Sequence, residues 1–189
     1  YNIEYMNCRS WFEAMKDTSI YPLYPKNGIH WSRYAEFIFA DSLLNRLEHI
    51  TGNRYPRINV HSLEVTDQSR FTDDDIEKGM NLMYELPDDS MAYPGWTIEI
   101  DPAVHTQKVL TIADRYYWDL YNLCLSNDVF NNSEFWYYCA AVYPESKDEI
   151  VTVWDINYVE RMEQNDAVVL ICTDANLHRF PFGLIKQMR

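Results

Sequence analysis

The stretch KVLTIADRYYW, residues 108–118, decides the fold class that this sequence predicts. Lys108–Ala113 has the length and composition of a buried strand, and the run ends at Asp114-Arg115. A helical face follows, with side chains at the spacing of successive turns: Tyr117, Leu120, Tyr121 and Cys124. A buried strand that passes directly into an amphipathic helix is the building unit of an α/β domain.

The rest of the second half repeats this alternation. Three further apolar runs predict strands: Phe135–Tyr143, Glu149–Trp154 and Ala167–Cys172. Asn157–Gln164 predicts a short helix with Val159 and Met162 on one side. The 189 residues are therefore expected to form one α/β domain with a mostly parallel sheet that is covered on both faces.

The first half predicts a long helix that follows an extended loop. Residues 2–6 read weakly as a strand and Cys8–Met15 as a short helix, before a proline-punctuated loop at 21–32. Ser32 is a suitable N-cap for a helix over about 33–50. Gly52 stands just past its end, where a C-terminal glycine is expected.

A strand and a second helix are expected next. Arg57–Val65 alternates in the manner of a strand, and Thr72-Asp-Asp-Asp75 predicts a helix start with a capping box. The buried stripe of that helix is expected to be Ile76, Met80 and Met83. The acids of its first turn are better explained by the helix dipole than by a metal.

The charge balance argues against two classes of partner. The chain carries 16 basic and 29 acidic residues, a net charge of −13, and such a field repels phosphate backbones and anionic membranes. We therefore expect no nucleic-acid partner, although the acidic excess is also explained by solubility alone. The longest apolar run, Phe135–Tyr143, is too short for a membrane span. No secretory signal is visible, and the start at Tyr1 indicates a processed form or a fragment.

Composition also speaks against cofactors and metals. With 5 glycines and no phosphate-binding glycine motif, nucleotide chemistry is not expected. The four cysteines form no C-x-x-C pair and have no histidine at zinc spacing: Cys8, Cys124, Cys139 and Cys172. They are interpreted as structural, with one disulfide left open. We expect no cofactor and no metal.

Polar residues follow three of the predicted extended segments. His30, beside Trp31, is either a general base or a loop histidine packed on the tryptophan ring, and residue types alone favour the second. Asp114 is best explained as a helix N-cap. Arg115 is positioned to bind a carboxylate or phosphate, or forms a surface pair with Asp114.

The last of these loops offers an amide. Asn176 either donates to an oxyanion or belongs to a turn built on Asx side chains. The aromatic run Trp136-Tyr137-Tyr138 is suited to stacking on sugar rings, and equally to a protein core. These residue types alone do not decide between function and structure.

Taken together, four blocks resemble the SGNH-hydrolase-like family of alginate O-acetyltransferases. They are YPLYPKNGIHWS at 21–32, KVLTIADRYYW at 108–118, SEFWYYCAAVYP at 133–144 and AVVLICTDANL at 167–177, in the family's order. The resemblance implies a three-layer α/β/α domain and a Ser–His–Asp triad that moves or hydrolyses O-acetyl groups on extracellular polysaccharides. It also implies an extracytoplasmic location and a missing amino-terminal segment that would carry any signal or anchor.

The resemblance carries over to this chain only in part. His30 matches the family's catalytic base, but Gly28 stands where the family has its orienting aspartate. Ala113-Asp114-Arg115 matches the nucleophile block with arginine at the serine position. Asn176 matches a polar position more loosely, and Trp31 and Tyr116 are the expected substrate contacts beside these residues. Arginine is neither a nucleophile nor deprotonatable, so catalysis is expected to be impaired.

Four functional alternatives stay open. The chain is expected to be an impaired acetyl-esterase or O-acetyltransferase, or else a non-catalytic domain that binds a polysaccharide or another anion. The rivals are a competent enzyme and a purely structural fragment. Because parallel strands bring their carboxyl ends to one edge, His30, Arg115 and Asn176 are expected to converge there. Arg115 is expected to project into a cleft, with Asp114 facing back toward the helix start.

Overall fold

The computed structural model describes residues 3–101, 104 and 107–187, and these form two compact units. The first unit comprises residues up to Leu43 together with Ile58–Thr97, and the second comprises Leu44–Arg57 together with the residues from Ile98 onward. The division falls inside helix α2 (Arg33–Thr51), which belongs in part to each unit.

Helix α2 begins and ends where the sequence predicts. The Ser32 Oγ accepts a hydrogen bond from the Ala35 N–H at 3.2 Å, as an N-cap should. At the other end Gly52 adopts φ +71° and donates its N–H to the Glu48 carbonyl at 2.9 Å. Helix α1 (Cys8–Met15) is also confirmed, with an Asn7 cap on the Ser10 N–H. The weak strand expected at 2–6 is wrong over residues 3–6, and residue 2 lies outside the described residues.

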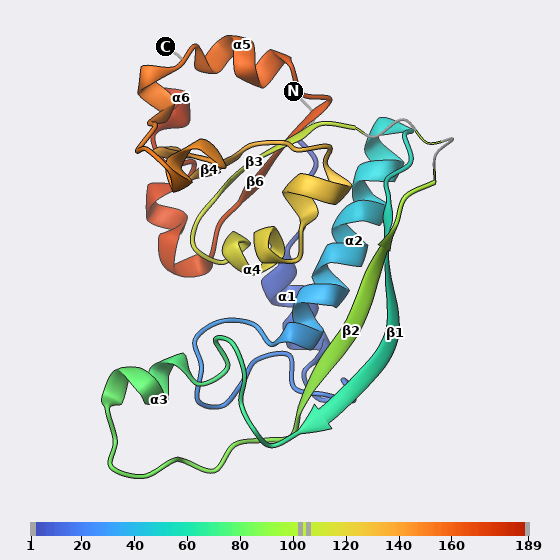
Figure 1. The fold of residues 1–189 in the computed structure, drawn as a ribbon, viewed down its shortest axis with the longest axis vertical. Coiled ribbons are helices and arrows are strands. Elements are labelled where there is room, and N and C mark those ends of the chain that lie inside the picture. The colour runs from blue at the N-terminus through green and yellow to red at the C-terminus, as the bar shows by residue number, and fades with distance from the viewer. Residues whose placement is uncertain (1–2, 102–103, 105–106, 188–189) are drawn as a thin grey trace. The chain divides into compact units, whose positions relative to one another are not determined.

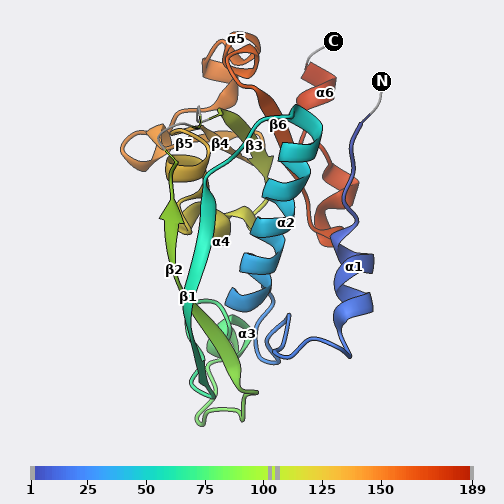
Figure 2. The same ribbon diagram turned by 90° about the vertical axis from the view of Figure 1, so that its right-hand side faces the viewer.

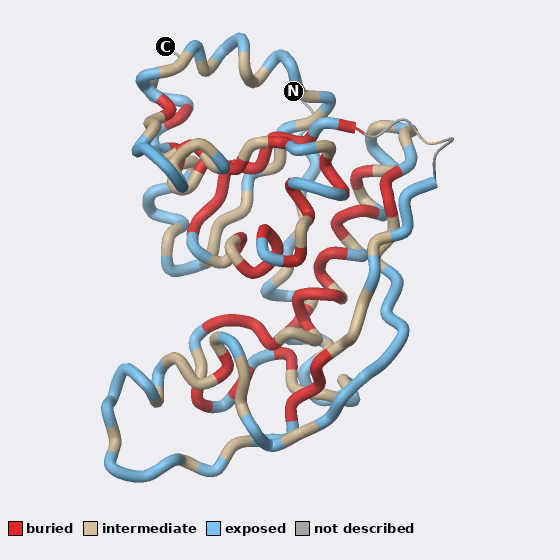
Figure 3. The backbone as a smooth tube through the Cα atoms, in the orientation of Figure 1, coloured by how far each residue is buried: buried red, intermediate tan, exposed pale blue. Residues whose placement is uncertain are grey.

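The first unit contains a two-stranded sheet, and the sequence predicted only one of its two strands. Strand β1 (Arg57–Thr66) is confirmed, and it pairs with β2 (Met91–Glu99), for which no strand was predicted (Figures 1 and 2). β1 is exposed along most of its length, whereas β2 begins with the buried residues Met91–Tyr93 (Figure 3). These two strands therefore do not join the predicted parallel sheet.

Helix α3 (Asp75–Met80) lies in the segment between these strands, and its predicted burial is wrong. No side chain caps its amino end, and Ile76, Met80 and Met83 are exposed instead of forming a buried stripe. The helix is anchored through its backbone, because the N–H groups of Ile76 and Glu77 donate to the Asn27 carbonyl at 3.1 and 3.3 Å. The outer side of the helix is therefore left uncovered in this unit.

The second unit contains a four-stranded mixed sheet of order β5-β4-β3-β6, and the protein is accordingly an α/β protein. β3 (Val109–Ala113) pairs in parallel with β4 (Phe135–Tyr137) and with β6 (Ala167–Ile171). Val109 lies opposite Ala167 and Ala113 opposite Ile171, so the carboxyl ends of β3 and β6 meet at one edge. Every residue of β3 is buried, as a central parallel strand requires (Figure 3).

Helices cover β3 on both faces. On one side α4 (Tyr117–Asn122) buries Tyr117, Leu120 and Tyr121 as the sequence spacing predicts, and the ring centroids of Tyr117 and Phe135 lie 4.8 Å apart. Cys124, the last residue of the predicted face, lies beyond the helix with φ +63°. A π-helix, Leu125–Val129, continues this layer. On the other side Leu110, Ile112 and Trp136 share a core cluster with Leu184 of α6 (Leu184–Gln187). Short 3-10 helices complete the unit, at Glu145–Lys147, Val153–Asp155 and Asp174–Arg179.

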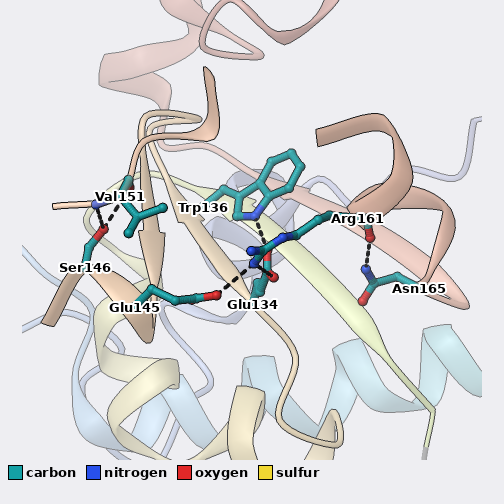
Figure 4. Close-up of polar contacts among 7 residues, drawn as sticks. All are labelled: Glu134, Trp136, Glu145, Ser146, Val151, Arg161 and Asn165. Atoms are coloured by element: carbon teal, nitrogen blue, oxygen red, sulfur yellow. Dashed lines mark hydrogen bonds and ion pairs between the residues drawn. The ribbon is translucent and has the colours of Figure 1, made fainter. Parts of the chain in front are cut away.

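Two strand predictions in this unit are wrong. The run 135–143 is a hairpin of β4 with antiparallel β5 (Ala141–Tyr143), because Tyr138 and Cys139 adopt φ +53° and +49° and reverse the chain. The stretch expected as a strand at 149–154 forms one isolated bridge and a 3-10 turn. The Val151 N–H donates to the Ser146 Oγ at 3.1 Å and so does not join a strand ladder, whereas the Val151 carbonyl accepts both from the Ser146 hydroxyl and from the Val142 N–H of β5 at 2.9 Å (Figure 4).

Helix α5 (Tyr158–Glu163), capped by Asn157 as predicted, is tied to the sheet through Arg161. The Arg161 guanidinium donates to Glu145 at 2.7 Å and also to Glu134, whose other oxygen accepts from the Trp136 indole N–H at 2.7 Å (Figure 4). The two carboxylates raise the pKa of Arg161. One arginine therefore links α5 to the start of β4 and to the turn after β5.

All four thiols are free, so the disulfide left open by the sequence is not formed. Among the described residues no helix combines the length and the apolar character that a membrane crossing requires.

Candidate functional site

Asp114 stands at the carboxyl end of β3, and its fully buried carboxylate holds two loops together. One oxygen accepts from the Thr173 N–H at 2.8 Å, the Thr173 hydroxyl at 2.7 Å and the Asn176 amide at 3.0 Å. The other accepts from the Tyr116 N–H at 3.2 Å. Neutral donors thus surround this carboxylate, and it joins the residues after β3 to those after β6.

This arrangement corrects the role expected for Asp114. The residue was predicted to cap the following helix, but the N-cap of α4 is Tyr116, and no side chain caps that helix. Asp114 was also expected to face back toward the helix start, but its carboxylate contacts Asn176 in the loop after β6. Its amide nitrogen faces three oxygens, those of Asp114, Tyr138 at 3.3 Å and Thr173 at 3.2 Å. That amide therefore serves the loop-to-loop contact through its donor nitrogen.

Arg115 is exposed immediately after this buried carboxylate. It lies close enough to Tyr137 to oppose electrostatically the burial that raises the pKa of the Tyr137 phenol. Arg179 contributes a second guanidinium at the same edge, 5.6 Å from the ring centroid of Tyr138, and Tyr137 and Tyr138 are themselves 4.7 Å apart. Within the described part of the chain, no ion pair joins Arg115 or Arg179 to a carboxylate.

Sequence reasoning missed Arg179 and Tyr138 as members of this edge. Tyr138 was noted only within an aromatic run, and Arg179 comes just after the last quoted block. For Arg179 the available signal was its position in the loop after the predicted strand at 167–172, whereas Tyr138 lies inside the predicted strand 135–143 and gave no such signal. We call Arg115, Tyr137, Tyr138 and Arg179 the arginine-tyrosine edge.

Cys172 lies at the end of the run that precedes Thr173, and its thiol is not suited to nucleophilic chemistry. Burial, followed by the negative charges of Asp114 and Asp174, raises its pKa to about 11. A thiol with that pKa is almost entirely protonated near neutral pH. Cys139, raised to about 11 by burial alone, is equally unreactive.

His30 belongs to the first unit, where Asp75 binds it. Its Nδ1 lies 2.8 Å from one oxygen of Asp75, and the other oxygen accepts from the Ile29 N–H at 2.8 Å. The imidazole is buried, with 4% of its surface exposed. The expectation that His30 lacks an orienting carboxylate is therefore wrong: α3 supplies one from a distant part of the sequence.

The surroundings of Gly28 explain why the carboxylate that binds His30 belongs to a distant residue, Asp75. A Cβ atom at this position would lie 2.6 Å from the Asp73 carbonyl oxygen and 2.7 Å from that of Thr72. Backbone atoms cannot yield in the way that a flexible side chain does, so an aspartate does not fit at position 28 without rearrangement. The close approach of the 28 loop to the start of α3 brings Asp75 to the histidine instead.

A second buried carboxyl lies in the same unit. Asp73 is 2% exposed, and it accepts a hydrogen bond from the Tyr93 hydroxyl at 2.6 Å. Burial is the main cause that raises its pKa from 3.8 to about 6, and the hydrogen bond from Tyr93 partly opposes the rise. Asp73 is thus a titrating group close to the acidic range of physiological pH.

The two expected substrate contacts, Trp31 and Tyr116, belong to different units. Trp31 is 5% exposed, and its ring centroid lies 4.9 Å from that of Phe39 inside the first unit. Tyr116 is half-buried beside Asp114 in the second unit. The structure brings Asp114, Arg115 and Asn176 to one sheet edge, while convergence of His30 with them stays a prediction.

The second unit also contains a pocket of about 500 Å³. It is lined mainly by charged residues, including Glu48, Arg54, Arg57 and Glu99, and by none of the predicted site residues. Across residues 3–101, 104 and 107–187, no group of three or more histidine, cysteine or acidic side chains is arranged to hold a metal ion.

Comparison with models of known protein families, with curated proteins and with solved structures gives no match in any of the three.

Proposed function

We propose that the second unit is an SGNH-hydrolase-like three-layer domain that has lost ester chemistry and binds a polysaccharide through its arginine-tyrosine edge. The observation that carries the proposal is Arg115, an exposed arginine at the position where the resembling family has its serine. A guanidinium neither attacks an acyl carbon nor gives up its proton, so serine-type catalysis has no starting group there.

The binding half of the proposal rests on the same edge. Half-buried tyrosine rings offer apolar faces on which sugar rings stack, and their hydroxyls offer polar partners. Arg115 and Arg179 add positive charge to a protein whose net charge is −13. Guanidinium groups bind carboxylates in a bidentate manner, so an anionic sugar fits this edge better than a neutral one.

A second candidate, a competent acyl-transfer enzyme, is favoured by one observation. His30 has a carboxylate partner in Asp75 at 2.8 Å, the arrangement that orients a general base. An ester assay separates the two candidates, because only an enzyme turns over p-nitrophenyl acetate in a manner that depends on His30.

For the proposed binding domain we expect no ester turnover above buffer. Calorimetry should show binding of a polyuronate and weaker binding of a neutral glucan of matched length. Arg115→Gln and Arg179→Gln should each weaken polyuronate binding by about tenfold, the effect expected of a charged contact at the centre of a site. Arg54→Gln, an exposed arginine of the same unit at the pocket described above, is the matched control. Turnover that disappears in His30→Ala would contradict the proposal.

A further inference from the structure

Helix α3 and the segment that joins it to β2 present apolar side chains to solvent. Ile76, Met80, Met83 and Tyr84 are 44%, 59%, 101% and 70% exposed, and we call these four residues the α3 strip. None of the residues 75–90 is buried (Figure 3). Single exposed apolar residues are common, but here four such residues fall within nine positions, and exposed apolar side chains that gather in one region mark interaction sites.

Only part of the α3 strip lies on one helical face. Ile76 and Met80 stand at i and i+4 within α3, but the helix ends at Met80, Asn81 adopts φ +49°, and Met83 lies beyond the helix, so the face that the sequence predicts over 76–83 is not completed. The first unit leaves them exposed, since α3 is anchored through its backbone to Asn27. Methionine side chains are flexible and polarizable, and such residues suit a surface that packs against a partner of variable shape.

The rim of the α3 strip is strongly acidic. Residues 72–90 contain seven carboxylates and a single base, Lys78. Their net charge of −6 is nearly half of the chain's net charge of −13. Lys78 is paired with Asp74 at 2.8 Å, while Asp73 and Asp75 face Tyr93 and His30 inside the unit. Glu85 and Asp89 are exposed, and neither forms an ion pair with any described residue.

Hydrogen bonds within the first unit already order this segment in the unbound protein. The Glu77 carboxylate accepts from the Leu86 N–H at 2.7 Å, and Asp88 is bonded by the Ser69 hydroxyl. Together with the Asn27 contacts, these bonds fix both ends of the α3 strip. A surface that is already ordered loses less conformational entropy on binding than a disordered loop would.

We propose that the α3 strip is a docking surface for a basic amphipathic helix of a partner protein. The apolar stripe of such a helix packs on Ile76, Met80, Met83 and Tyr84, and its flanking lysines or arginines face Glu85 and Asp89. An anionic membrane is disfavoured by the charge of the rim. A second copy of this chain would bring an equally acidic rim to the contact and is disfavoured for the same reason. The surface is independent of the arginine-tyrosine edge.

The test uses the whole chain and a synthetic 18-residue helical peptide with leucines on one face and lysines on the other. We expect binding in the micromolar range by calorimetry, and a scrambled peptide of identical composition should bind at least about tenfold more weakly. Met80→Gln with Met83→Gln should weaken binding by about tenfold. Glu85→Gln with Asp89→Asn should weaken it by several fold and flatten its dependence on salt. Ile150→Gln, equally exposed but in the second unit, is the matched control and should change nothing.

Three results would overturn the proposal. One is equal affinity for the ordered and scrambled peptides, which would mean that charge alone drives binding. Another is an affinity unchanged by the methionine substitutions in protein whose circular dichroism is unaltered. The third is concentration-dependent dimerisation in sedimentation that Met83→Gln abolishes, which would assign the strip to self-association.

Discussion

The Nδ1 atom of His30 lies 2.8 Å from a carboxylate oxygen of Asp75, 45 residues further along the chain. The other oxygen of Asp75 accepts from the Ile29 N–H, so one carboxylate fixes both the backbone and the ring at this loop. With Asp75 ionised, the hydrogen of the ring resides on Nδ1 and is donated to the carboxylate. This contact sets the tautomer of His30 whatever reaction or ligand the protein serves.

Asp75→Asn should remove this control. An amide offers one acceptor oxygen in place of two, so the Ile29 N–H and the Nδ1–H of His30 cannot both keep an acceptor. We expect the free energy of unfolding to fall by about 1–3 kcal/mol, as for other buried donors left unpaired. The downfield proton signal of the His30 Nδ1–H should disappear from the NMR spectrum. Asp17→Asn, at an exposed position, should change stability by less than about 0.5 kcal/mol. An unaltered tautomer in Asp75→Asn would refute this role.

Gly28→Ala should destabilise the first unit because its Cβ would meet two carbonyl oxygens at under 3 Å. The expected loss is about 1–3 kcal/mol, the usual cost of overpacking, measured by urea unfolding. Gly79→Ala is the matched control, since a Cβ at that helical position meets nothing within 4 Å. Alanine there should raise stability by about 0.5–1 kcal/mol. If the two substitutions had the same effect, the close approach of the 28 loop to α3 would be disproved.

Asp73 should make stability depend on pH in a specific direction. Its pKa is raised from 3.8 to about 6, so its stabilising contribution is complete below the ordinary carboxyl value and is lost as the pH rises through about 6. Asp73→Asn keeps an acceptor for Tyr93 and carries no charge. The variant should therefore be more stable than the parent by about 1–3 kcal/mol at pH ~7.5, and the difference should vanish near pH ~4. A difference that is constant across this range would contradict the assignment.

Asp114→Asn should uncouple the ends of β3 and β6. The new NH₂ group would face the Thr173 N–H, the Thr173 hydroxyl or the Asn176 amide, and at least one buried donor would lose its acceptor. We expect a loss of about 2–3 kcal/mol and faster hydrogen exchange at the Thr173 amide. Asp148→Asn, at an exposed site in the same unit, should leave both measurements unchanged. Unchanged exchange at Thr173 in Asp114→Asn would argue against the loop-to-loop contact.

The sequence by itself determined the elements whose signals are local. Ser32 and Gly52 bound α2, and the apolar runs 109–113 and 167–171 became the parallel strands β3 and β6. Capping hydrogen bonds and side-chain periodicity involve residues within a few positions of one another, and the sequence displays them directly. The α/β class follows from these elements, and so does the placement of Arg115 and Asn176 at one edge of the sheet.

Only the tertiary structure decided which distant groups meet. Asp75 reaches His30 because Gly28 allows two backbones to approach closely, and Thr173 donates to Asp114 across 59 positions of sequence. The stripe of Ile76, Met80 and Met83 has the period of a buried face, yet it is exposed. Periodicity shows that side chains share a face, but burial depends on whether another segment covers that face. A local pattern contains no information about that second segment, and long-range packing therefore decided these features.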